Sequence, residues 1–350
     1  MAKITINQIA EELNLSRNTI SKVLNQKGGV SEKTKQLVLG KAKQMGYKQA
    51  GFLAFEMPES GVDNPACPSG QKKLLLVTSK IPMNEHFGVR ALETFQKEIN
   101  DKGYALEISI VTEEEMRGYK VPRGLENGDI EGIVCIEMFD RDYSSYLCEC
   151  GKPVLFMDAS VDLDESYTNM DLILMENRNS LEILVNKMLA ENYRKFGFVG
   201  DKNHCRSFYE RWEACDNVLK RFGITDFDTY SICDMDQERY HDYRWLCQKL
   251  KELEKLPEVF FCANDQIGVT LARALREIGL SVPADIKVIG FDDMPAAAIS
   301  NPTLTTVRIN SDAIGEIAAD LILSRIRNPK LPSRYTYVQT VPVFRESTGT

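Results

Sequence analysis

The first part of the chain contains two short runs of apolar residues at helical spacing. The apolar positions are Ile6, Ile9, Ala10 and Leu13 in the first run and Ile20, Val23 and Leu24 in the second. Leu15, in the turn between them, can fill the space between two helices. Thr5 and Gln8 form a capping box for the first helix, and Ser16 can cap the second. The segment from Thr5 to Asn25 is therefore predicted to be a helix-turn-helix.

A third helix is predicted from Ser31 to Met45, with Gly46 as its end. Three helices are enough for a small core, so residues 1–48 are predicted to form a three-helix helix-turn-helix domain. Residues 49–72 are rich in Gly, Pro and Ser and are predicted to be a hinge or linker.

Beyond residue 73, short apolar runs alternate with amphipathic stretches. The runs predicted to be buried strands are Leu74–Val77, Leu106–Val111, Gly132–Ile136, Val154–Met157, Phe196–Val199, Val259–Ala263 and Lys287–Phe291. The stretches predicted to be helices include Val89–Lys102, Ser180–Asn192, Phe208–Arg221 and Gln266–Ile278. This alternation is typical of a doubly wound parallel sheet with helices on both faces. The series is too long for one small sheet, so we predict two α/β lobes with a cleft between them.

The charge of the chain is divided unevenly. The first 50 residues hold eight Lys and one Arg against three Glu, a net charge of +6; the whole chain carries −8, so the other 300 residues carry −14. An acidic body with a basic head is expected of a protein that contacts nucleic acid at one end only. A basic helical hairpin without a ligand would have the same charge. The outer positions of the second helix favour nucleic acid, because Arg17, Asn18, Ser21 and Lys22 suit base edges and phosphates.

Composition and motifs narrow the functional class. No segment approaches the roughly 18 apolar residues of a membrane span, and the N-terminus lacks an apolar signal core, so a soluble cytoplasmic protein is expected. The nine Cys are scattered without a C-x-x-C pair, which favours reduced, mostly buried thiols. The sequence has no phosphate loop, no G-x-S-x-G elbow and no H-E-x-x-H, and His86, His204 and His241 are widely separated. We therefore predict no catalytic residues, no metal and no cofactor.

Several motifs occur in a characteristic order. In the head they are Leu15-Ser16-x-x-Thr19-Ile20-Ser21-Lys22-Val23-Leu24-Asn25, Gly29-Val30-Ser31 and Gly46-Tyr47. In the body they are Ala263-Asn264-Asp265-Gln266, Gly279-Leu280-x-Val282-Pro283-x-Asp285-Ile286, Gly290-Phe291-Asp292-Asp293 and Pro302-x-Leu304-Thr305-Thr306-Val307. In this order and spacing the chain resembles the lactose-repressor (LacI/GalR) family of transcriptional regulators.

The resemblance implies a homodimer whose two heads enter successive major grooves of a pseudo-palindromic double-stranded operator. Each head would be joined to a periplasmic-binding-protein-like body of two doubly wound parallel-sheet lobes, with a small-molecule effector in the cleft. The first lobe is expected at about 73–172 and 294–327, and the second at about 173–293 and 328–350.

The resemblance also implies which residues contact DNA. They are Thr5, Ser16, Arg17, Asn18, Thr19, Ser21, Lys22 and Asn25. Arg17, Asn18 and Lys22 would read base edges. The alternative for each is a phosphate contact that carries no sequence information.

In the body, Ser207 and Arg211 match the family's Ser-x-x-x-Arg position, where the arginine grips the ligand. Asp265 resembles the family's ligand-binding acid, and Asp158 follows a strand of the first lobe. Two acidic acceptors with one arginine donor would suit a sugar or another polyol. The alternatives are that Arg211 and Asp265 pair with each other, and that Asp158 caps the next turn.

Two aromatic residues complete the predicted effector site. Phe87 could stack on the apolar face of a sugar, and Trp212 could line the pocket. Both could instead be structural core residues.

The hinge departs from the family pattern. After Gly46-Tyr47 the family expects Pro-Asn-x-x-Ala-Arg-x-Leu, whereas this chain has Gln49-Ala50-Gly51-Phe52-Leu53-Ala54-Phe55-Glu56. Phe52, Leu53 or Phe55 could still serve as an apolar wedge in the minor groove. Alternatively, this run packs on the body or stays flexible.

Together these features predict a sequence-specific transcriptional regulator, with repression of carbohydrate-related genes as the expected role. A sugar or sugar derivative in the cleft would set operator affinity. The alternatives are a cytoplasmic small-molecule binding protein and a sugar-active enzyme, neither with operator function.

Overall fold

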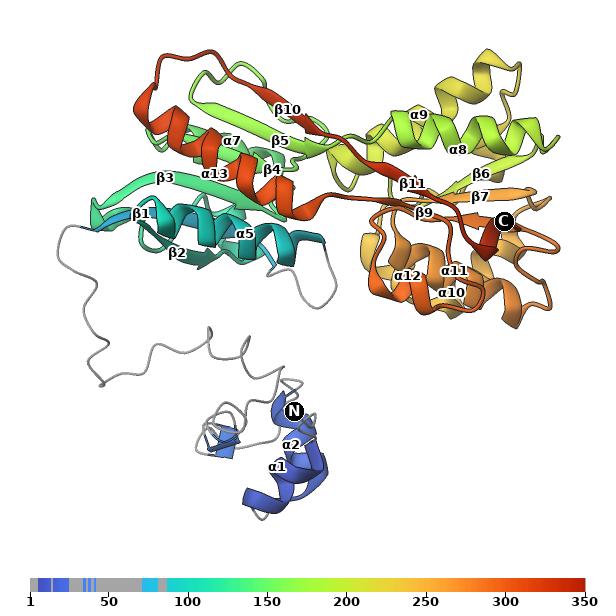
Figure 1. Ribbon diagram of the computed structural model, residues 1–350, viewed down its shortest axis with the longest axis horizontal. Coiled ribbons are helices and arrows are strands. Elements are labelled where there is room, and N and C mark those ends of the chain that lie inside the picture. The colour runs from blue at the N-terminus through green and yellow to red at the C-terminus, as the bar shows by residue number, and fades with distance from the viewer. Residues whose placement is uncertain are drawn as a thin grey trace. The chain divides into compact units, whose positions relative to one another are not determined.

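The computed structural model describes residues 6–13, 15–24, 34–35, 37–38, 41, 71–80 and 87–349. The chain divides into two compact units, Met1–Cys67 and Pro68–Thr350 (Figure 1). The predicted hinge at 49–72, with Phe52, Leu53 and Phe55, lies outside the described residues except for its last two positions.

The first unit contains the two predicted helices, α1 (Ile6–Leu13) and α2 (Arg17–Leu24). The prediction that Ser16 caps α2 is confirmed, because its Oγ accepts a hydrogen bond from the Thr19 N–H at 3.0 Å. The buried apolar residues of this unit include Ile9, Ala10, Ile20, Val23 and Val38. Most of the predicted third helix lies outside the described residues, although Val38 within it is helical and buried.

A six-stranded parallel sheet forms the centre of the first lobe. Its strands are β1 (Lys72–Thr78), β2 (Tyr104–Ile110), β3 (Ile130–Ile136), β4 (Val154–Met157), β5 (Met170–Met175) and β10 (Tyr335–Val338). They lie in the order β10-β5-β4-β3-β1-β2. Successive strand residues point to opposite faces, and both faces are buried: Leu74 and Leu76 join one apolar cluster, and Leu75 and Val77 join the other.

Helices cover both faces of this sheet (Figure 1). The helices α5 (Phe87–Asp101) and α13 (Ser311–Arg327) pack against each other on one face, and α7 (Arg141–Glu149) lies on the other. Gly315 permits the close approach of α13 to α5, because a Cβ at this position would lie 2.3 Å from the Ala91 carbonyl oxygen. The first lobe is thus a doubly wound α/β layer structure, as predicted.

The second lobe has a smaller sheet. Its parallel strands β6 (Phe196–Val199), β7 (Val259–Cys262) and β8 (Lys287–Ile289) lie in the order β6-β7-β8. The antiparallel pair β9 (Thr306–Arg308) and β11 (Val341–Val343) continues beside β8 through a bridge between Ile289 and Thr305. The helices of this lobe are α8 (Asn179–Ala190), α9 (Arg206–Arg221), α10 (Tyr243–Glu252), α11 (Asp265–Glu277) and α12 (Pro295–Ile299).

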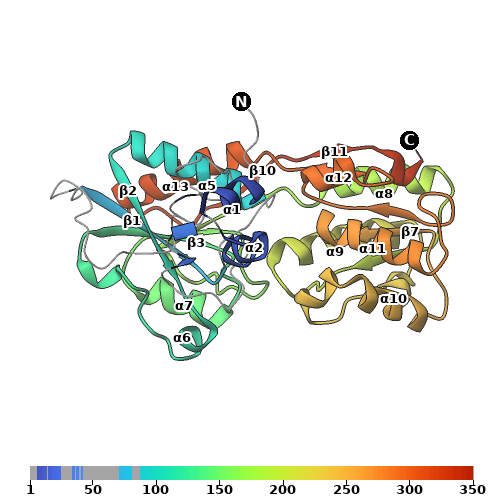
Figure 2. The same ribbon diagram turned by 90° about the horizontal axis from the view of Figure 1, so that it is seen from below.

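The chain passes between the lobes three times, after β5, after β9 and after β10 (Figures 1 and 2). Two predicted lobe boundaries are therefore wrong. Residues 294–308 were expected in the first lobe, but α12 packs on α11 and β9 continues beside β8 in the second. Residues 328–338 were expected in the second lobe, but β10 pairs with β5 in the first sheet.

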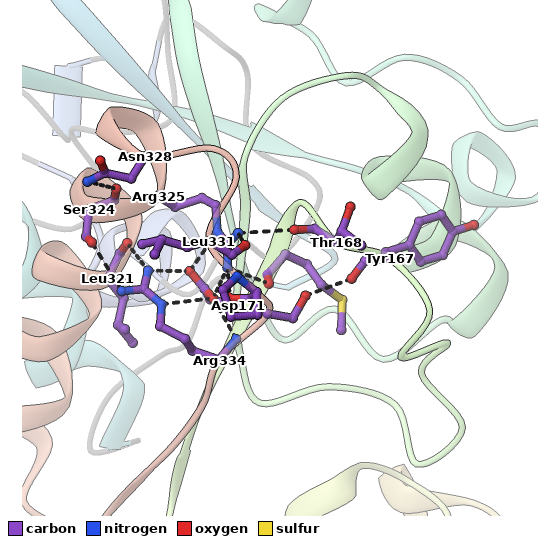
Figure 3. A network of polar contacts seen from close by, with 12 residues as sticks. Tyr167, Thr168, Asp171, Leu321, Ser324, Arg325, Asn328, Leu331 and Arg334 are labelled. Carbon is purple, nitrogen blue, oxygen red and sulfur yellow. Dashed lines mark hydrogen bonds and ion pairs between the residues drawn. The ribbon is translucent and has the colours of Figure 1, made fainter.

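Asp171 on β5 is held by two arginines in the interior of the first lobe (Figure 3). Arg325 of α13 donates to both carboxylate oxygens, at 2.5 and 3.1 Å, and Arg334 donates through its Nη2 at 2.6 Å and its backbone N–H at 2.9 Å. Arg325 also donates to the carbonyl oxygens of Thr168, Leu331 and Pro332. The network therefore fixes β5, the end of α13 and the entry into β10 to one another.

The cysteines and the helices of the described part of the chain bear on the redox state and on membrane insertion. The eight cysteines within it carry free thiols, five of them buried. None of its helices combines the length and the apolar character needed to cross a bilayer.

Candidate functional site

A cavity of about 650 Å³ lies between the two lobes of the body. From the first lobe it is lined by Lys80 after β1, Glu137 after β3 and Asp158 after β4. From the second lobe it is lined by residues that include Arg211 of α9 and Asp292 after β8. The carboxyl ends of parallel strands from both sheets thus meet there, which is where open α/β sheets bind ligands. The volume falls in the range of small-molecule sites, about 300–1,000 Å³.

Three carboxylates in the cavity lie on unusual backbone. Glu137, Asp158 and Asp292 have φ angles of +52°, +67° and +115°. Residues other than glycine rarely adopt such angles, and those that do cluster at functional sites. The backbone therefore directs carboxyl groups into the space between the lobes at some conformational cost.

Burial raises the pKa values of all three carboxyl groups. Burial, with smaller contributions from the charges of Asp158 and Asp292 and against the opposing effect of Lys80, raises the pKa of Glu137 to about 7. It also raises the pKa of Asp292 to about 7, with Arg211 opposing the shift and Asp158 adding to it. Burial also raises the pKa of Asp158, and the backbone N–H of Ala159, which donates to its carboxylate at 2.8 Å, opposes this rise.

Arg211 is 2% exposed and connects several parts of the site. Its Nε donates to Asn177 Oδ1 at 3.0 Å, and its Nη1 donates to the Ala263 carbonyl oxygen at 2.6 Å. The same Nη1 lies 3.5 Å from Asp292 Oδ1, and the guanidinium stacks 3.6 Å from the centre of the Phe291 ring. Asn177 belongs to the crossing segment after β5, so Arg211 links the cavity to a connection between the lobes.

The contacts that join the lobes at the cavity include an ion pair and an aromatic pair. The Nζ of Lys80, in the first lobe, lies 3.0 Å from a carboxylate oxygen of Glu238 in the second. The ring of Phe139, in the first lobe, packs edge-on against His204 in the second, with centroids 4.9 Å apart. Burial lowers the pKa of His204 to about 4, so this imidazole is neutral near pH 7.

Of the predicted effector residues, Asp158, Ser207 and Arg211 line the cavity. Ser207 is held by Asn177, whose Nδ2 donates to its Oγ at 3.3 Å, and its backbone N–H donates to Asp158 at 3.3 Å. The predicted alternative for Asp158 also holds in part, because its carboxylate accepts from Ala159 in the following turn.

The prediction for Asp265 is corrected by the structure. This residue is fully buried and does not line the cavity. Its carboxylate accepts from the Met294 N–H at 2.8 Å and from the Thr306 hydroxyl at 2.5 Å. Asp265 therefore fixes α11 to the segment after β8 and to the start of β9, and Arg211 pairs with Asp292 instead.

Trp212 does not line the cavity either. Its indole N–H donates to Asp228 at 3.3 Å, and the ammonium of Lys202 lies 3.7 Å from its ring centre. Trp212 therefore has a structural role, which was the alternative to its predicted place in the pocket. Phe87 begins α5, but its side chain lies outside the described residues.

Glu137, Asp292, Lys80 and His204 also line the cavity, although they were not among the predicted effector residues. The first three follow predicted strands directly or within a few residues, as Asp158 does. The rule that selects strand carboxyl ends could therefore have found them.

The described members of the predicted DNA-binding set lie on α2 or directly before it. Arg17 is exposed, and Thr19, Ser21 and Lys22 are partly exposed. Thr5, Asn25 and the side chain of Asn18 lie outside the described residues. α2 therefore buries Ile20 and Val23 and keeps basic and polar side chains accessible.

Comparisons with known proteins agree with this arrangement. Residues 5–49 match the family of bacterial regulatory proteins of the LacI type, and residues 185–348 match the periplasmic binding protein-like domain. The chain is 23% identical to the transcriptional regulator GalR of Lacticaseibacillus casei, over 98% of this chain and 99% of the relative. The fold resembles a lac repressor dimer bound to operator and the anti-inducer ONPF, with a TM-score of 0.67, 21% identity and 99% coverage of both chains. It also resembles the regulator CelR in complex with cellobiose, with a TM-score of 0.68, 20% identity and coverage of 99% of this chain and 100% of CelR.

A helix-turn-helix head followed by a two-lobed body with a periplasmic-binding-protein-like fold defines a class of transcriptional regulators. The chain belongs to that class. It carries a LacI-family helix-turn-helix domain and a periplasmic-binding-protein-like domain, and its full-length relatives are LacI/GalR-type transcriptional regulators.

Proposed function

We propose that this protein binds a pseudo-palindromic operator as a homodimer and that a small polar molecule in the interlobe cavity sets its operator affinity. The observation that carries the proposal is the cavity itself, where Arg211 and strand-end carboxylates from two lobes converge. Repression of carbohydrate-related genes is the role we favour. The solved relatives support it, since one is a lac repressor dimer on its operator and another holds cellobiose.

The mechanism is a shift between two arrangements of the lobes. Lys80 and Phe139 of the first lobe contact Glu238 and His204 of the second, so a molecule between them favours the closed arrangement. Closure would alter the spacing of the two heads in the dimer, with residues 49–72 connecting head and body. Effector and operator must then change each other's affinity by the same factor, typically about 5–150-fold.

The decisive experiment measures operator binding at several salt concentrations with and without the ligands that stabilise the body. A steep salt dependence shows phosphate contact. If ligands bind the body but leave operator affinity unchanged, the proposed coupling is refuted. If the protein binds no DNA sequence more tightly than nonspecific DNA, it is a binding protein or an enzyme without operator function.

Replacement of Arg17 by Ala is expected to reduce sequence preference, because Arg17 is exposed at the start of α2. A good bidentate arginine–guanine contact contributes about 1–3 kcal/mol of discrimination. The measurement compares operator with scrambled DNA by fluorescence anisotropy. Equal weakening on both DNAs would assign Arg17 to phosphates instead.

Replacement of Glu238 by Gln is expected to weaken effector binding by no more than about fivefold, because an exposed ion pair contributes about 0–1 kcal/mol. The Lys80–Glu238 pair joins the lobes at 3.0 Å but is largely exposed. Calorimetry of effector binding at low and high salt checks this. We expect the difference between the variant and the wild-type protein to disappear at high salt. A loss that persists at high salt would show that Glu238 contacts the effector directly.

A further inference from the structure

The start of α9 carries two adjacent stripes of polar side chains. Ser207 and Arg211, four residues apart, line the cavity between the lobes. Arg206 and Glu210, each one position earlier, lie outside that lining and contact the first lobe and a crossing segment instead. Residues four apart share one face of a helix, so α9 has one stripe that faces the cavity and a neighbouring stripe that faces the other lobe.

Arg206 joins the start of α9 to the first lobe. Its Nη1 lies 2.9 Å from Glu165 Oε1, in the connection between β4 and β5. The central carbon of its guanidinium lies 5.6 Å from the centre of the Tyr335 ring on β10. Its backbone N–H donates to the Ala159 carbonyl oxygen at 2.8 Å. The side chain of Glu165 is half exposed, so this ion pair is weaker than a buried one.

Glu210 forms the second part of this connection and is 2% exposed. Its Oε1 accepts a hydrogen bond from the Tyr337 hydroxyl of β10 at 2.7 Å, and its Oε2 accepts one from Asn177 Nδ2 at 2.9 Å. The same Oε1 lies 3.4 Å from Arg178 Nη2 and 3.6 Å from Arg206 Nε. Hydrogen bonds to charged groups are among the stronger ones. Glu210 therefore ties α9 both to a strand of the first lobe and to a crossing segment.

The pairs Arg206–Glu165 and Glu210–Tyr337 each join the second lobe to the first. The proposed movement turns the lobes relative to each other about the crossing segments, so separation of the lobes would stretch both pairs. Neither pair belongs to the lining of the cavity. A contact that forms in only one of two arrangements shifts the equilibrium towards that arrangement without any contact to the effector.

We propose that Arg206 and Glu210 of α9, with Glu165 and Tyr337 of the first lobe, form an interlobe latch that sets the ratio of closed to open protein before any effector binds. The latch and the effector act on the same equilibrium. The apparent affinity of an effector that binds the closed arrangement is therefore proportional to the closed fraction that the latch maintains. This inference rests on the proposed function, because it takes closure of the lobes as the movement that the effector favours.

Single-molecule energy transfer on the full-length protein measures the ratio of closed to open molecules without any ligand. The dyes are attached through unnatural amino acids at Glu114 on α6 (Glu113–Arg117) and at Lys251 on α10, two exposed positions in different lobes (Figure 2). This labelling leaves the nine cysteines unchanged. Labelled protein is mixed with an excess of unlabelled protein, so that any dimer holds one labelled subunit.

The test variant combines Tyr337→Phe, which removes the hydroxyl that donates to Glu210, with Glu165→Gln, which removes the charge that faces Arg206. We expect the ratio of closed to open molecules to fall by about tenfold, because the net contribution of a hydrogen bond to a charged group corresponds to a factor of about this size. The latch is overturned if the ratio in the double variant equals that of the wild-type protein.

Tyr335→Phe is the matched control on the same strand. It removes a tyrosine hydroxyl but keeps the ring near which the Arg206 guanidinium lies, so the ratio of closed to open molecules should stay at the wild-type value. An equal fall in Tyr335→Phe and in the double variant would overturn the assignment to Tyr337 and Glu165. Thermal unfolding followed by circular dichroism gives a second readout. A lower melting temperature of the double variant with an unchanged ratio would make these contacts structural only.

Operator affinity separates the latch from the proposed function. Without effector, the operator affinity of the double variant should change in the direction opposite to the change that effector causes, because the two act on one equilibrium in opposite senses. A large fall in the closed fraction with unchanged operator affinity would support the latch and refute the coupling of closure to the head. An unchanged ratio of closed to open molecules in a protein whose operator affinity still responds to a sugar would overturn the latch and leave the proposed function intact.

Discussion

Replacing Asp171 by Ala is expected to lower the free energy of unfolding of the body by about 3–5 kcal/mol, the usual cost of removing one partner from a buried ion pair. Asp171 is fully buried and accepts hydrogen bonds from both Arg325 and Arg334. Without the carboxylate, Arg325 remains as a buried positive charge whose other hydrogen bonds in the described part of the chain go to carbonyl oxygens. Chemical denaturation followed by circular dichroism measures the change.

The loss in free energy of unfolding caused by Asp171→Ala depends on pH, because the two arginines change the pKa of Asp171. Burial alone would raise the pKa of Asp171, but hydrogen bonds from Arg334 and Arg325 outweigh burial and lower it. A group whose pKa is lowered on folding stabilises the protein above its unfolded pKa, about 3.9, and that contribution is lost as the pH falls further. The difference in stability between the wild-type protein and Asp171→Ala should therefore be constant near pH 7 and shrink below about pH 4.

A matched control is available on the same helix as Arg325. Asp320 of α13 pairs with Lys102, but its side chain is 69% exposed. Asp320→Ala should therefore cost less than about 1 kcal/mol. Comparable losses in Asp320→Ala and Asp171→Ala would contradict the view that burial gives the Asp171 network its importance.

The Asp171 network also shows why one central strand could not be predicted. All seven predicted strands are present, with ends that differ by at most two residues. β5 (Met170–Met175) was missed because the acidic residue near its start interrupts the apolar run. Its arginine partners lie more than 150 residues later in the chain, so a local pattern could not show that this charge is compensated.

The path of the chain between the lobes was likewise only partly predictable. β10 has an alternating pattern of exposed and buried residues, which is typical of an edge strand and does not indicate which sheet it joins. Its partner β5 was itself missed. Tertiary pairing therefore decides the lobe boundaries near residue 335, and composition does not.

At the candidate site, the local sequence located the strand ends but did not show which carboxylate faces the cavity. Asp265 and Asp292 both follow strands of the second lobe, and the sequence favoured Asp265. In the structure, Met294 and Thr306 enclose the carboxylate of Asp265, whereas Asp292 faces the cavity. Strand ends can thus be found from sequence, but which carboxylate reaches the ligand depends on segments that pack there from elsewhere in the chain.

Arg211 has the position expected of a residue that couples the two lobes. It binds Asn177 in a crossing segment, the Ala263 carbonyl oxygen at the end of β7, and the charge of Asp292 in the cavity. Asn177 in turn donates to Glu210, which accepts a hydrogen bond from Tyr337 of β10 at 2.7 Å. A change in the cavity therefore has a continuous route through Arg211 to two of the segments that join the lobes.

Replacing Arg211 by Ala is accordingly expected to reduce the effector-dependent change in operator affinity from about 5–150-fold to nearly none. The basal affinity for operator should stay close to that of the wild-type protein, because the head is a separate unit. Arg211→Lys keeps the charge but loses the planar fork, so it should restore only part of the response. Arg221→Ala is the matched control, since Arg221 lies on the same helix in an exposed pair with Glu182. Anisotropy titrations of operator with and without the ligand that most stabilises the wild-type body measure all four proteins. A full response in Arg211→Ala would show that the cavity signals to the head by a route that bypasses this guanidinium.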